Sequence, residues 1–166
     1  MSKKNPFSYP KSSNKKALDE DELSIHLTQI NTNDNHKYCE ITNNIEVAVE
    51  VEFMENIRQS FDNLYFWTYN ITIINKGKYA VTLLHRHWYI IDANGEKQEV
   101  DGEGVIGKKP RIEAGSSFSY SSGVHLFTNF GIMRGEYLMK REDNQFIQVA
   151  IPQFSLSESS SNDIVN

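Results

Sequence analysis

The middle of the chain alternates hydrophobic and polar residues with a period of two. In residues 45–53 (IEVAVEVEF), Ile, Val and Phe take every second position, and glutamates take most positions between them. Residues 65–73 (YFWTYNITI) repeat the alternation, and residues 81–91 (VTLLHRHWYII) are a third run of β-branched and aromatic residues. Because successive side chains of a strand point to opposite faces of a sheet, this pattern predicts half-buried β-strands.

Turn sequences separate the predicted strands. Residues 75–77 (NKG) follow the second run, and residues 92–95 (DANG) follow the third with an Asn-Gly pair typical of a hairpin. Further strands are predicted at residues 117–121, 135–141 and 146–151. This series of short strands predicts an all-β fold, a fibronectin type III-like β-sandwich of about seven antiparallel strands with flexible tails.

The composition changes on either side of this region. Residues 1–44 combine a lysine-rich start with an acidic stretch and an Asn/Thr-rich stretch, which predicts a flexible N-terminal extension with one short helix at most, near 19–30. The predicted domain is 45–156, and the Ser-rich residues 157–166 are predicted to be a disordered C-terminal tail.

Charge and hydropathy narrow the classes of function. The 166 residues contain 22 acidic and 17 basic side chains, a formal net charge of -5, which argues against a nucleic-acid binder. No apolar run approaches the roughly 18 to 20 residues that span a bilayer, and the basic N-terminus lacks the apolar core of a signal peptide. The lone Cys39 suits a reducing compartment, so the sequence predicts a cytoplasmic protein without membrane insertion.

A GxGxxG motif lies at residues 102–107 and is followed by basic residues. In a dinucleotide-binding fold the motif joins a strand to a helix, and no helix pattern follows here, so we reject that interpretation. Two alternatives stay open: the glycines serve tight backbone geometry, or their amides form an anion-binding nest flanked by basic side chains. In the second case the ligand-binding residues are Gly102, Gly104, Gly107, Lys108 and Arg111.

Metal binding and catalysis find less support. His85 and His87 would share one face of a strand, and His125 is a candidate third ligand, but no zinc-type spacing accompanies them. Cys39 lies in the predicted extension, and no Gly-x-Ser-x-Gly motif or carboxylate pair stands out. The sequence therefore predicts no metal, no cofactor and no enzymatic activity.

Spaced motifs across residues 45–156 resemble the ApaG domain family. The matching positions are Leu83-Leu84, Arg86-His87-Trp88, Asp92, Glu99 through Gly107, Pro110, Phe118, Tyr120, Ser122-Gly123, Leu126, Thr128, Gly131, Met133, Gly135, Tyr137, Met139, Phe146, Val149, Ile151-Pro152 and Phe154. The chain departs from the family pattern at His85, Lys109 and Asn129.

The resemblance implies a fibronectin type III-like sandwich and an association with cobalt resistance and magnesium efflux. It also implies a protein-binding role, and a glycine loop considered for diphosphate binding that falls on Gly102, Gly104 and Gly107. We therefore expect a non-catalytic protein that acts through an unknown protein partner and affects cation handling indirectly. The alternative is a sensor of a pyrophosphate-containing ligand at the glycine loop, and edge strands with surface aromatics permit a homodimer.

Overall fold

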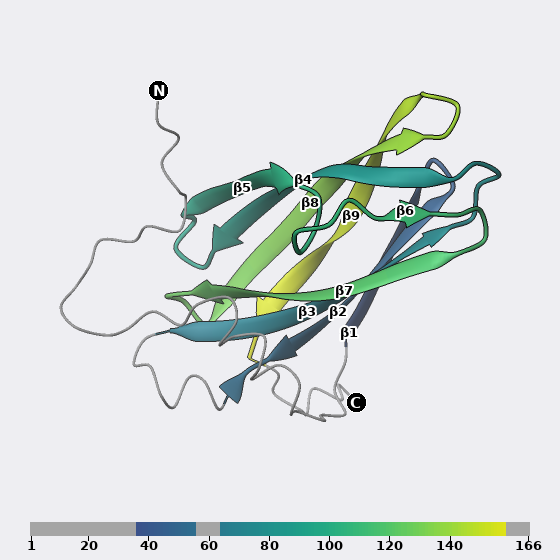
Figure 1. Ribbon diagram of the computed structural model, residues 1–166. Helices are drawn as coiled ribbons and strands as arrows, with labels where there is room; N and C mark the ends of the chain where they lie inside the picture. The colour runs from purple at the N-terminus through teal and green to yellow at the C-terminus, as the bar shows by residue number, and fades with distance from the viewer. Residues whose placement is uncertain (1–35, 56–63, 159–166) are drawn as a thin grey trace, which may run out of the picture.

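Two antiparallel β-sheets packed face to face make up the fold (Figure 1). The computed structural model describes residues 36–55 and 64–158. The first sheet has the order β1 (His36–Thr42), β2 (Ile45–Phe53), β3 (Tyr65–Asn75) and β7 (Ser117–Leu126). The second has the order β5 (Lys97–Glu103), β4 (Val81–Asp92), β8 (Phe130–Arg141) and β9 (Phe146–Ser157), and the short β6 (Arg111–Ile112) pairs with β4. The predicted all-β antiparallel sandwich is confirmed, with nine strands in the described residues.

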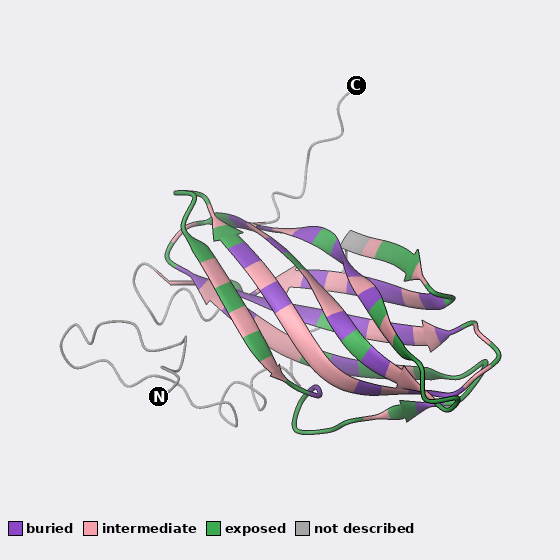
Figure 2. Cartoon of the chain, turned by 90° about the horizontal axis from the view of Figure 1, so that it is seen from above, coloured by how far each residue is buried: buried purple, intermediate pink, exposed green. Residues whose placement is uncertain are grey.

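The core lies between the sheets and follows the alternation of the sequence. Val47 and Ile71 of the first sheet are fully buried, as are Tyr137 and Met139 of the second. Figure 2, which looks down on the second sheet, shows buried and exposed positions alternating along its strands. Burying each large apolar side chain stabilises the fold by about 1.5 to 3 kcal/mol, so the inward faces hold the two sheets together.

The N-terminal boundary differs from the prediction. Strand β1 lies inside residues 1–44, which the sequence placed in a flexible extension. It pairs with β2 along its length, and Tyr38 packs against Phe154 with ring centroids 6.1 Å apart. Cys39 is therefore an exposed residue of an edge strand rather than part of a flexible segment.

A β-bulge in β4 lies beside the glycine motif. The register with β8 shifts between Leu83, which is buried, and His85, which lies opposite Leu138. The extra residue, Leu84, leaves its carbonyl to accept a hydrogen bond from Gly104 N at 2.8 Å. The bulge thus places His85 on the outer face of the second sheet and ties the glycine motif to β4.

Two predictions concern the ends of the chain. The helix expected near 19–30 lies outside the described residues. At the other end β9 continues to Ser157, the first residue of the predicted tail. Within residues 36–55 and 64–158, no helix is long and apolar enough to cross a membrane.

Candidate functional site

The glycine motif begins in β5 and ends in a tight hairpin turn. Val105 and Lys108 exchange two backbone hydrogen bonds of 2.8 and 2.9 Å, with two residues between them. Those residues, Ile106 and Gly107, have φ angles of 44° and 72°. Two positive φ angles in a two-residue loop define a type I′ turn, so the second half of the motif is a hairpin rather than a strand-to-helix loop.

Each glycine of the motif has a local geometric reason. At Gly104, φ is 58° and an added Cβ would lie 2.1 Å from the carbonyl oxygen of Lys108. At Gly102, an added Cβ would lie 3.1 Å from the Arg86 guanidinium. Gly107 has open space around it and needs only its positive φ. Backbone geometry therefore accounts for Gly104 and Gly107 without a ligand, whereas at Gly102 the close neighbour is the Arg86 side chain.

The amides of the loop are largely engaged by the protein itself. Gly104 N donates to Leu84 O, Val105 N to Lys108 O, and Lys108 N to Val105 O, all within 2.9 Å. An anion nest needs successive amides that point to one empty position. These three point to backbone carbonyls instead.

The basic residues after the loop lie beside carboxylates. The Lys109 ammonium is 2.9 Å from Glu103 and lowers the pKa of that carboxyl. Arg111 donates to Glu113 at 2.7 Å and to Glu142 at 3.1 Å, and these hydrogen bonds raise the pKa of its guanidinium. Lys108 is exposed at the turn. Of the five predicted ligand-binding residues, Arg111 therefore directs its charge toward two carboxylates. Anion binding at this loop stays a prediction.

Arg86 holds the loop in place, a role that sequence reasoning did not assign. Its Nη1 donates to the carbonyl oxygens of Glu103 at 3.1 Å and Gly104 at 2.8 Å. Nearby in the core, the buried hydroxyls of Tyr120 and Tyr137 share a 2.6 Å hydrogen bond. Burial raises the pKa of Tyr137, while the positive charge of Arg86 acts in the opposite direction. In the sequence, the sign of this role of Arg86 was its place in the Arg-His-Trp run at 86–88.

The two β4 histidines meet carboxylates of β5 on the outer face. His85 Nε2 lies 2.5 Å from Asp101 Oδ1, and His87 lies 3.2 Å from Glu99 and 3.4 Å from Asp101. Burial pushes the pKa of Asp101 upward, but hydrogen bonds and charge from the two histidines outweigh this and lower it.

The three-histidine metal hypothesis is not supported by this geometry. His125 lies on β7 of the other sheet, where its ring packs 5.5 Å from that of Phe66, and burial lowers its pKa. The structure therefore brings His85 and His87 together without His125. Among the residues that the structure describes, no group of three or more His, Cys, Asp or Glu side chains is arranged to hold a metal ion.

A surface hollow of about 210 Å³ opens beside the histidines. It is called the β4 hollow below, and its lining residues are His85, Arg86, His87, Asp101, Glu136, Tyr137, Leu138 and Gln148. Leu138 of β8, which lines the hollow, is 38% exposed, and Phe146 of the neighbouring strand β9 is 62% exposed. Phe146 pairs with Lys140, two residues from Leu138, so both apolar side chains lie on the same outer face. The hollow and these side chains form a mixed apolar and charged surface.

Comparisons with known proteins converge on one family. A family profile described as "ApaG domain" matches residues 55–141. The protein called "Protein ApaG" from Brucella abortus (strain S19) is 45% identical over 119 residues, which cover 72% of this chain and 92% of that protein. "Protein ApaG" from Allorhizobium ampelinum has the same identity and coverage.

Solved structures agree with the sequence matches. An X-ray structure of a structural-genomics target is 40% identical, with a TM-score of 0.69, and the match covers 75% of this chain and 94% of that one. The crystal structure titled "Putative ApaA Protein" from Bordetella pertussis is 32% identical, with a TM-score of 0.68, over 70% of this chain and 95% of that one. The similarity therefore extends over nearly the whole length of these proteins.

Proposed function

Since the chain belongs to the ApaG domain family, we propose that it is a non-catalytic protein that binds a protein partner and through it affects cobalt and magnesium handling. The observation that carries this proposal is the outer face of the second sheet. Leu138 and Phe146 expose large apolar side chains there, beside the charged rim of the β4 hollow. Apolar side chains surrounded by polar groups are typical of surfaces that bind proteins.

The size of the β4 hollow supports a protein partner over a drug-sized ligand at this face. Sites for drug-sized molecules usually measure about 300 to 1,000 Å³. The β4 hollow measures about 210 Å³ and opens onto a sheet face. A partner protein that inserts one apolar side chain between Leu138 and Phe146 would bury both.

The test compares a double variant with a matched control. Leu138→Ser/Phe146→Ser removes the apolar surface of the second sheet, and Ile41→Ser removes a 57% exposed side chain from β1 of the first sheet. Tagged versions are expressed in cells grown with cobalt, and the proteins that co-purify are identified. We expect one reproducible partner that the double variant loses and the control keeps, together with greater cobalt sensitivity of cells that carry the double variant.

Other results would count against the proposal. If the folded double variant retains the same partners and the same cobalt resistance as the parent, the outer face is not the binding surface. The pyrophosphate-sensor hypothesis has its own readout. Saturable shifts of the Gly102, Gly104 and Gly107 amides during a pyrophosphate titration would favour it over partner binding.

A further inference from the structure

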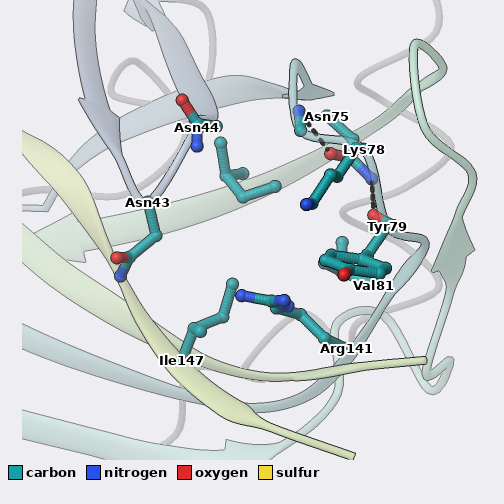
Figure 3. A pocket seen from close by; sticks show the side chains of 10 residues that line it. Asn43, Asn44, Asn75, Lys78, Tyr79, Val81, Arg141 and Ile147 are labelled. Carbon is teal, nitrogen blue, oxygen red and sulfur yellow. Dashed lines mark hydrogen bonds between the residues drawn. The ribbon is translucent and has the colours of Figure 1, made fainter. Parts of the chain in front are cut away.

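A second, smaller pocket lies where three turns of the sandwich meet. The β1–β2 turn, the β3–β4 loop and the neighbouring ends of β8 and β9 enclose about 100 Å³ (Figure 3). Ile45, Val81 and Ile147 give the pocket apolar walls. Two basic side chains, Lys78 and Arg141, extend toward its middle from different sides. This cavity is called the Arg141 pocket below.

The walls of the Arg141 pocket are fixed by local hydrogen bonds. Asn43 and Asn44 have φ angles of 51° and 61° and form the two-residue turn between paired β1 and β2. Asn43 Nδ2 donates to Gln148 O of β9 at 2.8 Å, which joins the two sheets. The fully buried Asn75 donates to Tyr79 O at 2.8 Å and accepts from Gly77 N at 3.0 Å, and these bonds shape the β3–β4 loop. A rigid wall lowers the entropic cost of holding a ligand.

Arg141 carries a buried donor that the protein does not satisfy. Its Nε is inaccessible to solvent and has no hydrogen-bond partner. The rest of the guanidinium is held, since Nη2 lies 2.5 Å from Asp143 and the group sits 4.3 Å from the centroid of the Tyr79 ring. A ligand in the pocket cannot reach this buried Nε, so it would meet the rest of the Arg141 guanidinium, which lines the pocket.

Lys78 adds a second positive charge. Its Nζ lies 5.0 Å from the centroid of the Tyr79 ring, and it forms no ion pair with any residue that the structure describes. Asp143 is the acid that faces the Arg141 guanidinium. Two cations against one carboxylate leave the pocket with an excess of one positive charge, which matches a monovalent anion better than a dianion.

We propose that the Arg141 pocket binds a carboxylate group that carries a short aliphatic chain. The carboxylate would lie beside the Arg141 guanidinium and the Lys78 ammonium, which both line the pocket, while the aliphatic part packs on Val81 and Ile147. The volume of about 100 Å³ suits an acid of a few heavy atoms. The same chemistry is offered by a free short-chain acid and by the carboxyl terminus of a peptide.

NMR titration of the full chain tests the proposal. Sodium propionate is added at constant ionic strength, with the Arg141 Nε–Hε signal and the amides of Lys78 and Asn44 as probes. We expect saturable shifts confined to the pocket. Lys78→Met, which changes an exposed side chain, should weaken propionate binding at least tenfold because it removes the excess charge. Lys97→Met, on the distant strand β5, is the matched control and should bind propionate like the parent.

Further arms identify the ligand and the outcomes that overturn the proposal. A tetrapeptide with a free carboxyl terminus is compared with its amide. Stronger binding of the free peptide than of propionate assigns the site to peptide termini, whereas binding of propionate alone assigns it to a small acid. Equal shifts with sodium chloride, tighter binding of phosphate, or no shift with any of these probes would each overturn the carboxylate assignment.

Discussion

The glycine loop and the Arg141 pocket contain similar parts, but they differ in how far their amides and basic side chains are already bonded to other groups of the protein. Each includes a two-residue turn with positive φ angles, at Ile106-Gly107 and at Asn43-Asn44, and each has basic side chains nearby. At the glycine loop, the amides point to carbonyls, and Arg111 contacts two carboxylates. Of the two basic side chains at the Arg141 pocket, only Arg141 has an acid partner among the described residues, namely Asp143.

The difference shows that a motif and an available binding site are separate properties. The GxGxxG spacing is visible in the sequence, yet its glycines serve a hairpin and a close backbone approach. No motif marks Lys78 and Arg141, which lie far apart in the sequence. Their availability depends on which acids the fold places beside them, so it becomes visible only in three dimensions.

The largest expected effect tests whether the glycines of the loop are architectural. Gly104→Ala forces a Cβ onto the Lys108 carbonyl at a positive φ, and we expect it to lower the free energy of unfolding by about 3 kcal/mol or more. Gly107→Ala has a positive φ but open space, and should cost about 1 kcal/mol. Urea denaturation of both variants measures this, and equal small losses would contradict the architectural explanation.

A second experiment asks whether acids alone prevent anion binding near the loop. The double variant Glu113→Gln/Glu142→Gln removes both carboxylates from Arg111. In the parent, Glu142 accepts a hydrogen bond from Ala80 N, and the amide oxygen of the new glutamine can still accept it. Because exposed ion pairs contribute little, we expect only a small change in stability. Titration with pyrophosphate should then shift the Arg111 Nε–Hε signal in the variant and leave it unchanged in the parent. A shift in the parent would show that the paired cation is already available.

The smallest expected effect is a pH dependence of the stability, caused by Asp101, which pairs with His85 and His87. The pKa of Asp101 lies below its ordinary value of 3.8, chiefly because His85 opposes the effect of burial. A lowered pKa means that the native state binds fewer protons, so this stabilisation is present above pH 3.8 and disappears as pH falls through the lower native value. Relative to Asp101→Asn, the parent should be more stable by less than about 1 kcal/mol at neutral pH. Thermal unfolding between about pH 5 and about pH 2 measures the difference, and a gap that widens as the pH falls through this range would contradict it.

The strands that sequence patterns predicted are those with one buried face. Residues 45–53 place alternate side chains in the core, so β2 was predicted with the bounds that the structure gives. Strand β5 (KQEVDGE) alternates between exposed and half-buried residues at a sheet edge, and no hydrophobic period identifies it. Strand β1 is also an edge strand, and its Asn- and Thr-rich surroundings concealed the contribution of Tyr38 to the core.

The candidate sites were predictable only in part. The i and i+2 spacing correctly placed His85 and His87 on one face, because strand geometry is local. Their carboxylate partners depend on the register between β4 and β5, and the role of Arg86 depends on the path of residues 103–104 over its side chain. Such contacts join residues that are distant in the sequence, so pattern analysis of single segments does not identify them.

Strand β9 determines when the domain can fold during its synthesis. The Trp67 indole donates to Ser157 O at 2.9 Å, and the Tyr38 hydroxyl bonds that of Ser155 at 2.7 Å across a sequence separation of 117 residues. Phe154 and Leu156 complete the core between the sheets. A ribosome must therefore release the whole of β9 before the sandwich can close, and long-range pairing of this kind is slow. Until then the Trp67 and Tyr69 side chains of β3 lack their contacts with Ser157 and Phe154.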